Sequence, residues 1–207
     1  YLGEAYHKFS ISDQYALAEK VCSTVHASYV GLTAFWLIFV KGFFTRDPAW
    51  AYPQECDNMY SFMVAYQLYD MFIMALQRTD PPAMWLHHLV SLLGAFAIQL
   101  YRVAAFPPTM FTVTELTVPF ANFDWYIKKL KLSDPWYFLN LKFMVAAYFG
   151  FRFFTGPLTV LWLVYKGQVG RFFQVPLVVS GLSTFNVLTL SVLNVMWTSK
   201  LYRRLFR

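Results

Sequence analysis

Charged residues are scarce in this chain. Asp, Glu, Lys and Arg make up 14% of its 207 residues, whereas hydrophobic residues make up 58% and aromatic residues 21%. A soluble globular domain carries about 25% charged residues, so this composition excludes an ordinary water-soluble domain and is typical of a membrane protein. The aromatic excess fits a lipid-facing surface with a belt of Tyr and Trp at the membrane interface.

Cysteine and the common catalytic motifs are also lacking. Cys22 and Cys56 have no CxxC or Cys–His spacing, and HExxH, GxSxG, GxGxxG and P-loop motifs do not occur. These absences exclude a thiol-ligated cluster and a zinc protease, and four histidines are too few for a di-iron desaturase. We therefore expect no metal site. Local polarity predicts that Cys22, in an apolar run, is buried and that Cys56, in a polar segment, is exposed.

The formal net charge of +6 comes largely from KKLK (128–131) and KLYRRLFR (200–207), both of which lie beside apolar runs. Basic residues in such places anchor membrane helices, and the sequence has no nucleic-acid signature. The predicted loops on the side of both termini hold more Lys and Arg than those on the other side. The positive-inside rule then places both termini in the cytosol, or in the matrix if the membrane is mitochondrial.

Apolar runs of about 20 residues, enough to cross a hydrocarbon core of about 30 Å as a helix, recur along the chain. We predict an all-α, polytopic membrane protein with six transmembrane helices near 21–44, 59–77, 84–101, 108–126, 136–165 and 174–201. Pro119 predicts a kink in the fourth helix, and Gly156-Pro157 a tilt or break in the long fifth one. The predicted domains are an interfacial lead-in (1–20), one membrane domain (21–201) and a basic tail (202–207).

Ionisable side chains lie inside these predicted spans, where a charge costs at least about 2.5–3.5 kcal/mol on insertion scales. They are His26, Asp70, His87, His88, Glu115 and Arg152. Such groups usually face a bundle interior, so we predict a shared polar cavity. Adjacent helical positions point about 100° apart. One histidine of the His87–His88 pair should therefore face the cavity and the other a neighbouring helix.

Helical spacing predicts two further pairs. Glu115 and Asn122 are two turns apart and share a face. The Tyr66 hydroxyl lies one turn from Asp70 and can donate a hydrogen bond to its carboxylate.

Structural roles remain open for several of these groups. The histidine pair can serve as hydrogen-bonding glue between helices, and His26 as a packed side chain without chemistry. A buried ion pair between Asp70 and Arg152 would set the register of two helices, which is as reasonable as a catalytic role for either residue.

Short motifs, each weak alone, occur in order along almost the whole chain: STVHA (23–27), YQLYD (66–70), WLHHLVSLLG (85–94), TELTVPFANFDW (114–125), FRFFTGP (151–157) and LNVMW (193–197). Because these motifs occur in this order, the chain resembles the TLC-domain proteins, which include the ceramide synthases and several lipid-linked relatives. The resemblance implies a barrel-like bundle of six helices around a cavity that holds a long acyl chain, with the histidine pair partway across. It also implies the endoplasmic reticulum or another endomembrane, with the mitochondrial inner membrane as the alternative.

The resemblance further implies roles for the predicted site residues. In ceramide synthases the histidine pair supports acyl transfer from acyl-CoA to a sphingoid amine. Carried over, His87 or His88 would be the nucleophile or base, and Asp70 and Glu115 would orient and tune them. Residues expected to contact lipid are His26, Tyr66, Asn122 and Arg152.

One departure from the synthase pattern separates the two branches of the family. Ceramide synthases have a His-Asp pair and a second Asp three positions on, where this chain has Thr114-Glu115 and then Val118. This version resembles the non-synthase branch, which is associated with phospholipid composition, lipid sensing or trafficking.

Three functions stay open at this point. The chain is an acyl-CoA-dependent acyltransferase, a non-catalytic lipid-binding or sensing module, or an accessory subunit of a larger membrane complex, with mitochondria as one setting. Its expected partners are membrane lipids and, for the third function, other proteins of that complex. Acyl-CoA or a bound phospholipid is the expected ligand, with no metal, other cofactor or nucleic acid.

Overall fold

The computed structural model describes residues 6–7, 9–77 and 80–205 as helices joined by loops, and this part of the chain contains no strand. The prediction of an all-α protein is therefore confirmed. The elements are α2 (Ile11–Phe35), η1 (Trp36–Val40), α3 (Glu55–Gln77), α4 (Pro82–Tyr101), α5 (Phe106–Thr112), η2 (Val113–Thr117), α6 (Val118–Lys129), α7 (Asp134–Ala147), η3 (Tyr148–Phe153), α8 (Thr155–Tyr165), α9 (Val169–Phe172) and α10 (Leu177–Leu205).

Four helical segments are long and apolar enough to cross a membrane: Ile11–Val40, Pro82–Tyr101, Asp134–Tyr165 and Leu177–Arg204. The protein is therefore an integral membrane protein. The other two predicted spans also fold as helix, in α3 and in the α5–η2–α6 segment. Neither is among the segments that are both long enough and apolar enough to cross a membrane. For α3 the physical reason is its polarity, since Gln67 and Asp70 lie in its interior.

Both long segments that contain a proline change their helical geometry shortly before it. The 3₁₀ helix η2 precedes Pro119, and the π-helix η3 precedes Pro157. A proline frees the carbonyl group four residues earlier from its helical hydrogen bond. These carbonyl groups belong to Glu115 and Phe153, so the irregular turns fall where the sequence predicts a kink.

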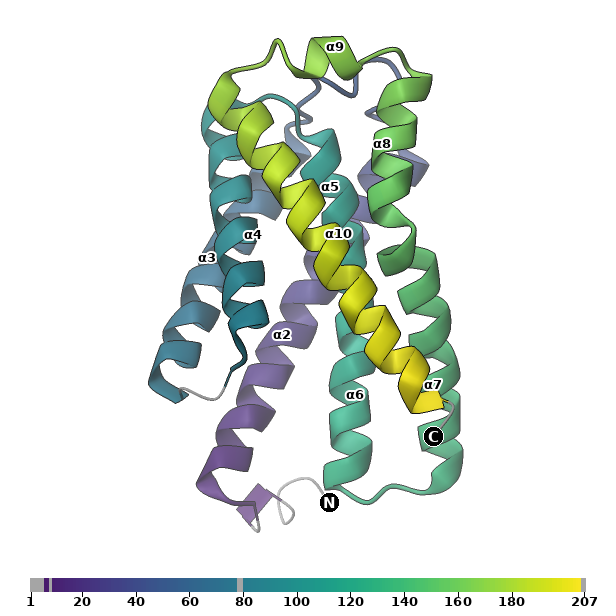
Figure 1. Cartoon of the computed structure of the whole chain (residues 1–207). Helices are drawn as coiled ribbons and strands as arrows, with labels where there is room; N and C mark the ends of the chain where they lie inside the picture. The colour runs from purple at the N-terminus through teal and green to yellow at the C-terminus, as the bar shows by residue number, and fades with distance from the viewer. Residues whose placement is uncertain (1–5, 8, 78–79, 206–207) are drawn as a thin grey trace.

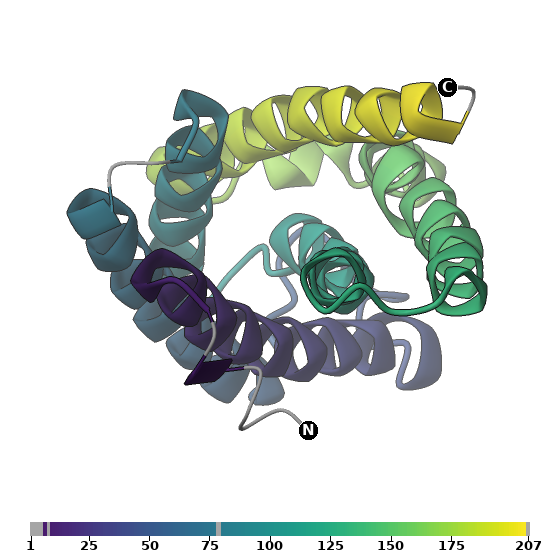
Figure 2. The same ribbon diagram turned by 90° about the horizontal axis from the view of Figure 1, so that it is seen from below.

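Neighbouring helices contact one another in sequence around the bundle. Helix α2 contacts α3, α3 contacts α4, α4 contacts α10, and α10 contacts η3 and α8, whereas α6 contacts both α7 and α2. Seen along the helices, α10 and α2 run along opposite sides and α7 lies between their ends, with α6 inside this outline (Figure 2). Helix α5 contacts α2, α8 and α10, and lies in the middle of the half of the bundle away from the termini (Figure 1).

The end of the bundle away from the termini is closed by packed side chains. The loops there bury Phe44, Ala49, Phe106, Phe172 and Val175 in the main hydrophobic core. These side chains belong to one hydrophobic core, so this end of the bundle is apolar inside among the described residues.

Polar contacts hold the loops of this closed end together. Arg171 pairs with Asp47 at 2.9 Å, and Arg102 pairs with Asp57 at 2.9 Å. The Tyr52 hydroxyl donates to the other carboxylate oxygen of Asp57 at 2.6 Å. Burial, together with this hydrogen bond, raises the pKa of Tyr52 well above its usual range, so the phenol keeps its proton.

The ends of the chain differ from the predicted domain bounds. Helix α2 begins at Ile11, where the Ser10 hydroxyl caps it by accepting a hydrogen bond from the Asp13 amide at 3.2 Å. Residues 11–20 of the predicted lead-in are thus continuous with the first span, and 1–5 and 8 lie outside the described residues. The basic tail likewise continues α10 through Leu205, and 206–207 lie outside the described part.

The predicted burial of the two cysteines is wrong. Cys22 is exposed on α2, and Cys56 is fully buried in the first turn of α3. The polar sequence around Cys56 reflects the loop before α3. Cys56 itself lies on the face of α3 that packs inward. Cys22 lies on the outward face of an apolar helix.

Close approach of α4 and α10 depends on Gly94. A Cβ atom at this position would overlap the Nδ2 atom of Asn186 on α10. Gly94→Ala is therefore expected to lower the free energy of unfolding by about 1–3 kcal/mol, because the helices or Asn186 must move. Thermal unfolding in detergent measures the effect.

Gly181→Ala provides the matched control for Gly94→Ala. A Cβ at Gly181 on α10 meets nothing within 4 Å. This change should be neutral or stabilise the protein by about 0.5–1 kcal/mol through helix propensity. Adding Asn186→Ala should remove most of the cost of Gly94→Ala. Equal behaviour of the two glycine variants would contradict the packing argument.

A partly buried ion pair joins the termini-side ends of α6 and α10. Arg204 donates to both carboxylate oxygens of Asp124, at 2.8 and 2.6 Å. Asp124→Asn is expected to lower the free energy of unfolding by about 1.5–3 kcal/mol, because bidentate charged hydrogen bonds are the strong ones.

Lys128 contacts the same carboxylate at 2.8 Å, but its side chain is 55% exposed. In thermal unfolding, Lys128→Gln should therefore cost no more than about 1 kcal/mol, and a larger loss than from Asp124→Asn would refute this ranking.

Candidate functional site

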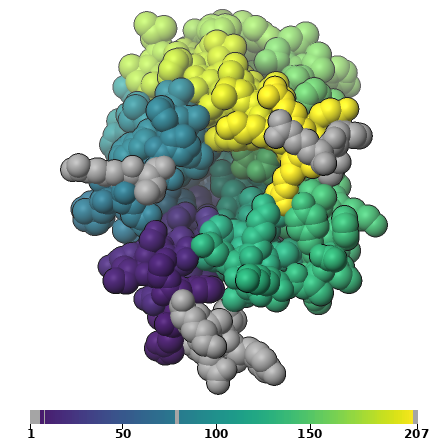
Figure 3. All heavy atoms as spheres, turned by 60° about the horizontal axis from the view of Figure 1, so that its bottom comes forward, coloured from purple at the N-terminus to yellow at the C-terminus, as the bar shows by residue number. Residues whose placement is uncertain are grey.

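A cavity of about 340 Å³ lies between the helices in the half of the bundle that carries the termini. The space-filling view toward this end shows a hollow between α2, α4, α6 and α10 (Figure 3). Most of the residues that line it have polar side chains, among them Asp70, His87, His88, Glu115, Asn122 and Arg152. With Tyr66 in the same lining, the structure brings together seven of the eight side chains that the sequence singles out for the site.

Four irregular or polar parts of the helices position these groups. Asp70 lies on the inward face of α3, one turn after Gln67, and both are buried. His87 and His88 lie in the second turn of α4, which begins after Pro81. Glu115 belongs to η2 and Arg152 to η3, so both come from the irregular turns before a proline.

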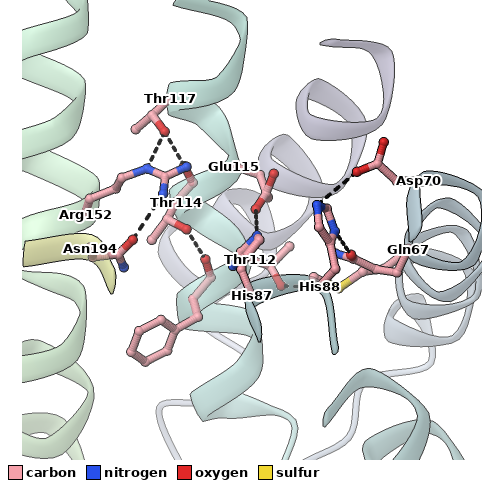
Figure 4. A network of polar contacts seen from close by, with 12 residues as sticks. Gln67, Asp70, His87, His88, Thr112, Thr114, Glu115, Thr117, Arg152 and Asn194 are labelled. Atoms are coloured by element: carbon pink, nitrogen blue, oxygen red, sulfur yellow. Dashed lines mark hydrogen bonds and ion pairs between the residues drawn. The ribbon is translucent and has the colours of Figure 1, made fainter. Parts of the chain in front are cut away.

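His88 is held by α3. Its Nδ1 contacts the Gln67 side-chain oxygen, and its Nε2 lies 2.9 Å from Asp70 Oδ2 (Figure 4). The second contact has the distance of an ion pair but not the alignment of a hydrogen bond, since Nε2 has no hydrogen-bond partner. Side chains of α3 thus lie against both ring nitrogens and hold the His88 ring in place.

His87 points away from α3. Its Nε2 lies 4.0 Å from Glu115 Oε1, and its ring meets Trp197 edge-on at 5.4 Å between centroids. The separation from Glu115 exceeds a hydrogen bond, so Nε2 can take a partner from the cavity. The prediction that the two histidines point in different directions, one toward a neighbouring helix, is confirmed.

Arg152 lies on the opposite side of the site from Asp70 (Figure 4). Its Nε donates to Thr117 Oγ1 at 2.6 Å, and its Nη1 donates to Asn194 Oδ1 at 3.1 Å. The hypothesis of an Asp70–Arg152 ion pair is wrong. Asp70 comes from α3 and faces His88, whereas Arg152 comes from η3 and faces η2 and α10.

Asn122 and Tyr66 both line the cavity, with different partners from those expected. The Asn122 amide donates to Thr24 Oγ1 at 2.9 Å and thereby joins α6 to α2. It shares the cavity with Glu115, as the helical spacing predicts. Tyr66 makes no hydrogen bond to Asp70; its ring stacks on His26 instead, at 3.8 Å between centroids.

His26 is not among the residues that line the cavity. It is 2% exposed and is stacked on both Tyr66 and Phe62. Neither ring nitrogen has a hydrogen-bond partner within the described part of the chain. The structure therefore favours the packing role of His26 over a direct lipid contact.

Sequence reasoning missed several neutral partners at the site. The Gln67 side-chain oxygen contacts His88 Nδ1, and the side-chain oxygens of Thr117 and Asn194 accept hydrogen bonds from Arg152. A search restricted to ionisable groups overlooks amides and hydroxyls. Their signal is the presence of Gln67 and Asn194 inside apolar helices, where an amide needs a partner.

A second, much smaller cavity of about 30 Å³ lies beyond the histidine pair, toward the closed end. His87 and Glu115 line both cavities, and the remaining walls of the small one include Met63, Phe111 and Leu190. The histidine pair thus stands at the inner end of the larger cavity. The resemblance implies a cavity that holds a long acyl chain with the histidine pair partway across, and the place of His87 in both linings agrees with this position.

This fold and this site define an all-helical integral membrane protein with a polar cavity that contains histidines, carboxylates and one arginine. Within the described residues, no group of three or more His, Cys, Asp or Glu side chains has the arrangement of a metal site.

The family model of the TLC domain matches residues 16–203, so the chain belongs to the TLC domain family. It is similar to TLC domain-containing protein 4-B of Danio rerio, with 23% identity over 198 residues, 91% of this chain and 73% of that protein. No solved structure gives a significant match. The resemblance to the non-synthase branch is thus confirmed.

Proposed function

We propose that this protein binds an acyl lipid whose polar end occupies the cavity of about 340 Å³. One observation carries the proposal: Asp70, His87, His88, Glu115 and Arg152 surround this cavity on helices of a membrane protein. Polar groups are costly in hydrocarbon and mark ligand sites or pathways when they gather inside a bundle. Membership of a lipid-related family supports the same function.

The proposal includes six membrane crossings in a barrel-like bundle, with α3 and the α5–η2–α6 segment as the two additional spans. Helix α3 contacts α2 and α4, both of which are long and apolar enough to cross. With both termini in the cytosol or the matrix, the cavity opens to that side. An endomembrane such as the endoplasmic reticulum is the proposed location, and the mitochondrial inner membrane the alternative.

Acyl transfer is the second candidate function, and the free Nε2 of His87 favours it. This nitrogen lies 4.0 Å from Glu115, which would stabilise a protonated imidazole. The amine or hydroxyl acceptor would give its proton to Nε2 and attack the thioester carbonyl of acyl-CoA. The carbon–sulfur bond then breaks, and CoA leaves as a thiol with that proton.

Native mass spectrometry of the purified protein tests the binding function. A lipid should remain bound to the wild type and be lost from Ala121→Trp, since Ala121 lines the cavity. The matched control is Ala146→Trp on the exposed surface of α7, which should retain the lipid. A lipid-free wild type, or a lipid that stays in Ala121→Trp, would refute the proposal. A protein that copurifies in fixed stoichiometry would favour the accessory-subunit function.

A further inference from the structure

Arg152 carries a positive charge inside a membrane helix. It lies in η3, within the span Asp134–Tyr165, and is only 6% exposed. A guanidinium is not deprotonated in proteins, so the charge persists despite burial. An isolated buried charge is strongly unfavourable unless another group compensates it.

No carboxylate of the described residues forms an ion pair with this guanidinium. None lies within 4.0 Å of the guanidinium, and both hydrogen bonds go to neutral acceptors, on Thr117 and Asn194. The rings of Trp197 and Tyr148, at 5.0 and 5.1 Å, stabilise a cation only in part. By contrast, Arg204, at the end of α10, has a bidentate carboxylate partner.

Part of the guanidinium is available to a ligand. Arg152 lines the large cavity, and its guanidinium has five N–H groups, more than its two neutral partners Thr117 and Asn194 take up. A planar guanidinium with free N–H groups suits the oxygens of a phosphate or a carboxylate. The geometry therefore fits an oxyanion better than a neutral group.

The acidic residues that line the cavity form no ion pair with Arg152. Asp70 is engaged with His88, and Glu115 faces His87. Glu19 and Asp80 are half-buried parts of the lining, together with Lys20. An anion against Arg152 would lie on the side of the cavity away from the Asp70–His88 pair.

We infer that Arg152 binds the anionic group, a phosphate or a carboxylate, of the lipid in the cavity. The inference rests on the proposed function and adds a chemical class to the ligand. The lipid would supply the counter-charge that the protein lacks at this position. It would also place its polar end beside His87, since Trp197 contacts both Arg152 and His87.

Three single-chain probes of equal length test the inference: dodecyl phosphate, dodecanoate and dodecanol. Their affinity for delipidated protein in a nonionic detergent is measured by calorimetry. The wild type should bind at least one anionic probe about tenfold or more tightly than dodecanol. Tighter binding of dodecyl phosphate identifies a phosphate ligand, and tighter binding of dodecanoate a carboxylate.

Variants locate the anion preference. Arg152→Gln should remove it and leave dodecanol binding in place, and Arg152→Lys should keep part of it. Lys142→Gln removes the same charge from an exposed position on α7, of the same helical segment, and should keep the preference intact. If Arg152→Gln fails to fold, the comparison of the three probes on the wild type and the reduced anion preference of Arg152→Lys still test the inference.

Two outcomes would overturn the inference alone: equal binding of all three probes by the wild type, or an anion preference that survives in folded Arg152→Gln. Binding of none of the probes by the wild type would instead overturn the proposed lipid-binding function. The two failures are thus distinguishable.

Discussion

His87→Gln is expected to lower any acyl transfer from acyl-CoA by about 10²- to 10⁴-fold, the usual contribution of a general base. His87 lines the large cavity, and its Nε2 lies 4.0 Å from Glu115 Oε1, which is longer than a hydrogen bond. Glutamine keeps the approximate size of the side chain but cannot take a proton. Lipid binding should survive, because the other cavity walls are unchanged.

Release of CoA, followed with a thiol-reactive chromophore, measures this prediction. Cys22 is exposed and would react, so the assay uses a Cys22→Ser background. His7→Gln is the matched control, since His7 is exposed at the start of the described chain. Turnover that survives in His87→Gln would contradict a base role for His87. A wild type that binds lipid without any turnover would leave binding as the function.

Asp70→Ala is expected to lower the free energy of unfolding by about 3 kcal/mol, the upper end of the cost of leaving a buried polar group without its partner. Asp70 is 6% exposed and lies 2.9 Å from His88 Nε2. Without the carboxylate, the buried ring loses its partner on that side, and Gln67 alone holds α4 to α3 at this level. Thermal or denaturant unfolding in detergent measures the loss.

Two companion variants define this effect. Asp80→Ala removes a half-buried carboxylate that makes no ion pair within the described residues, and should change stability by no more than about 0.5 kcal/mol. In a His88→Ala background, Asp70→Ala should cost much less than alone, because the coupled partner is already gone. Additive losses would show that the two side chains act independently.

The helices were predictable because each depends on nearby residues. Runs of apolar residues predict helices in the membrane, and Pro119 and Pro157 predict irregular turns through a hydrogen bond that proline cannot donate. The opposite directions of His87 and His88 follow from helical geometry alone. The start of α2 was misplaced, because a polar first turn from Ile11 lowers the apolar signal without ending the helix.

The partners of the site residues were not predictable in the same way. Spacing suggested Tyr66 as a partner of Asp70, and shared burial suggested Arg152. Asp70 instead meets His88, and Tyr66 stacks on His26. Helical period shows which residues share a face, but the face that each neighbour presents depends on how helices rotate and approach one another.

By itself, the sequence determined that this protein is helical, belongs in a membrane, and carries ionisable groups that must avoid lipid. These properties follow from local composition and from the cost of charge in hydrocarbon. Only the tertiary structure decided that the polar cavity lies on the termini side, that His88 contacts Asp70 while His87 faces Glu115, and that Arg152 forms no ion pair within the described residues. Those features depend on contacts between distant helices, such as α4 with α10 at Gly94, which no local pattern specifies.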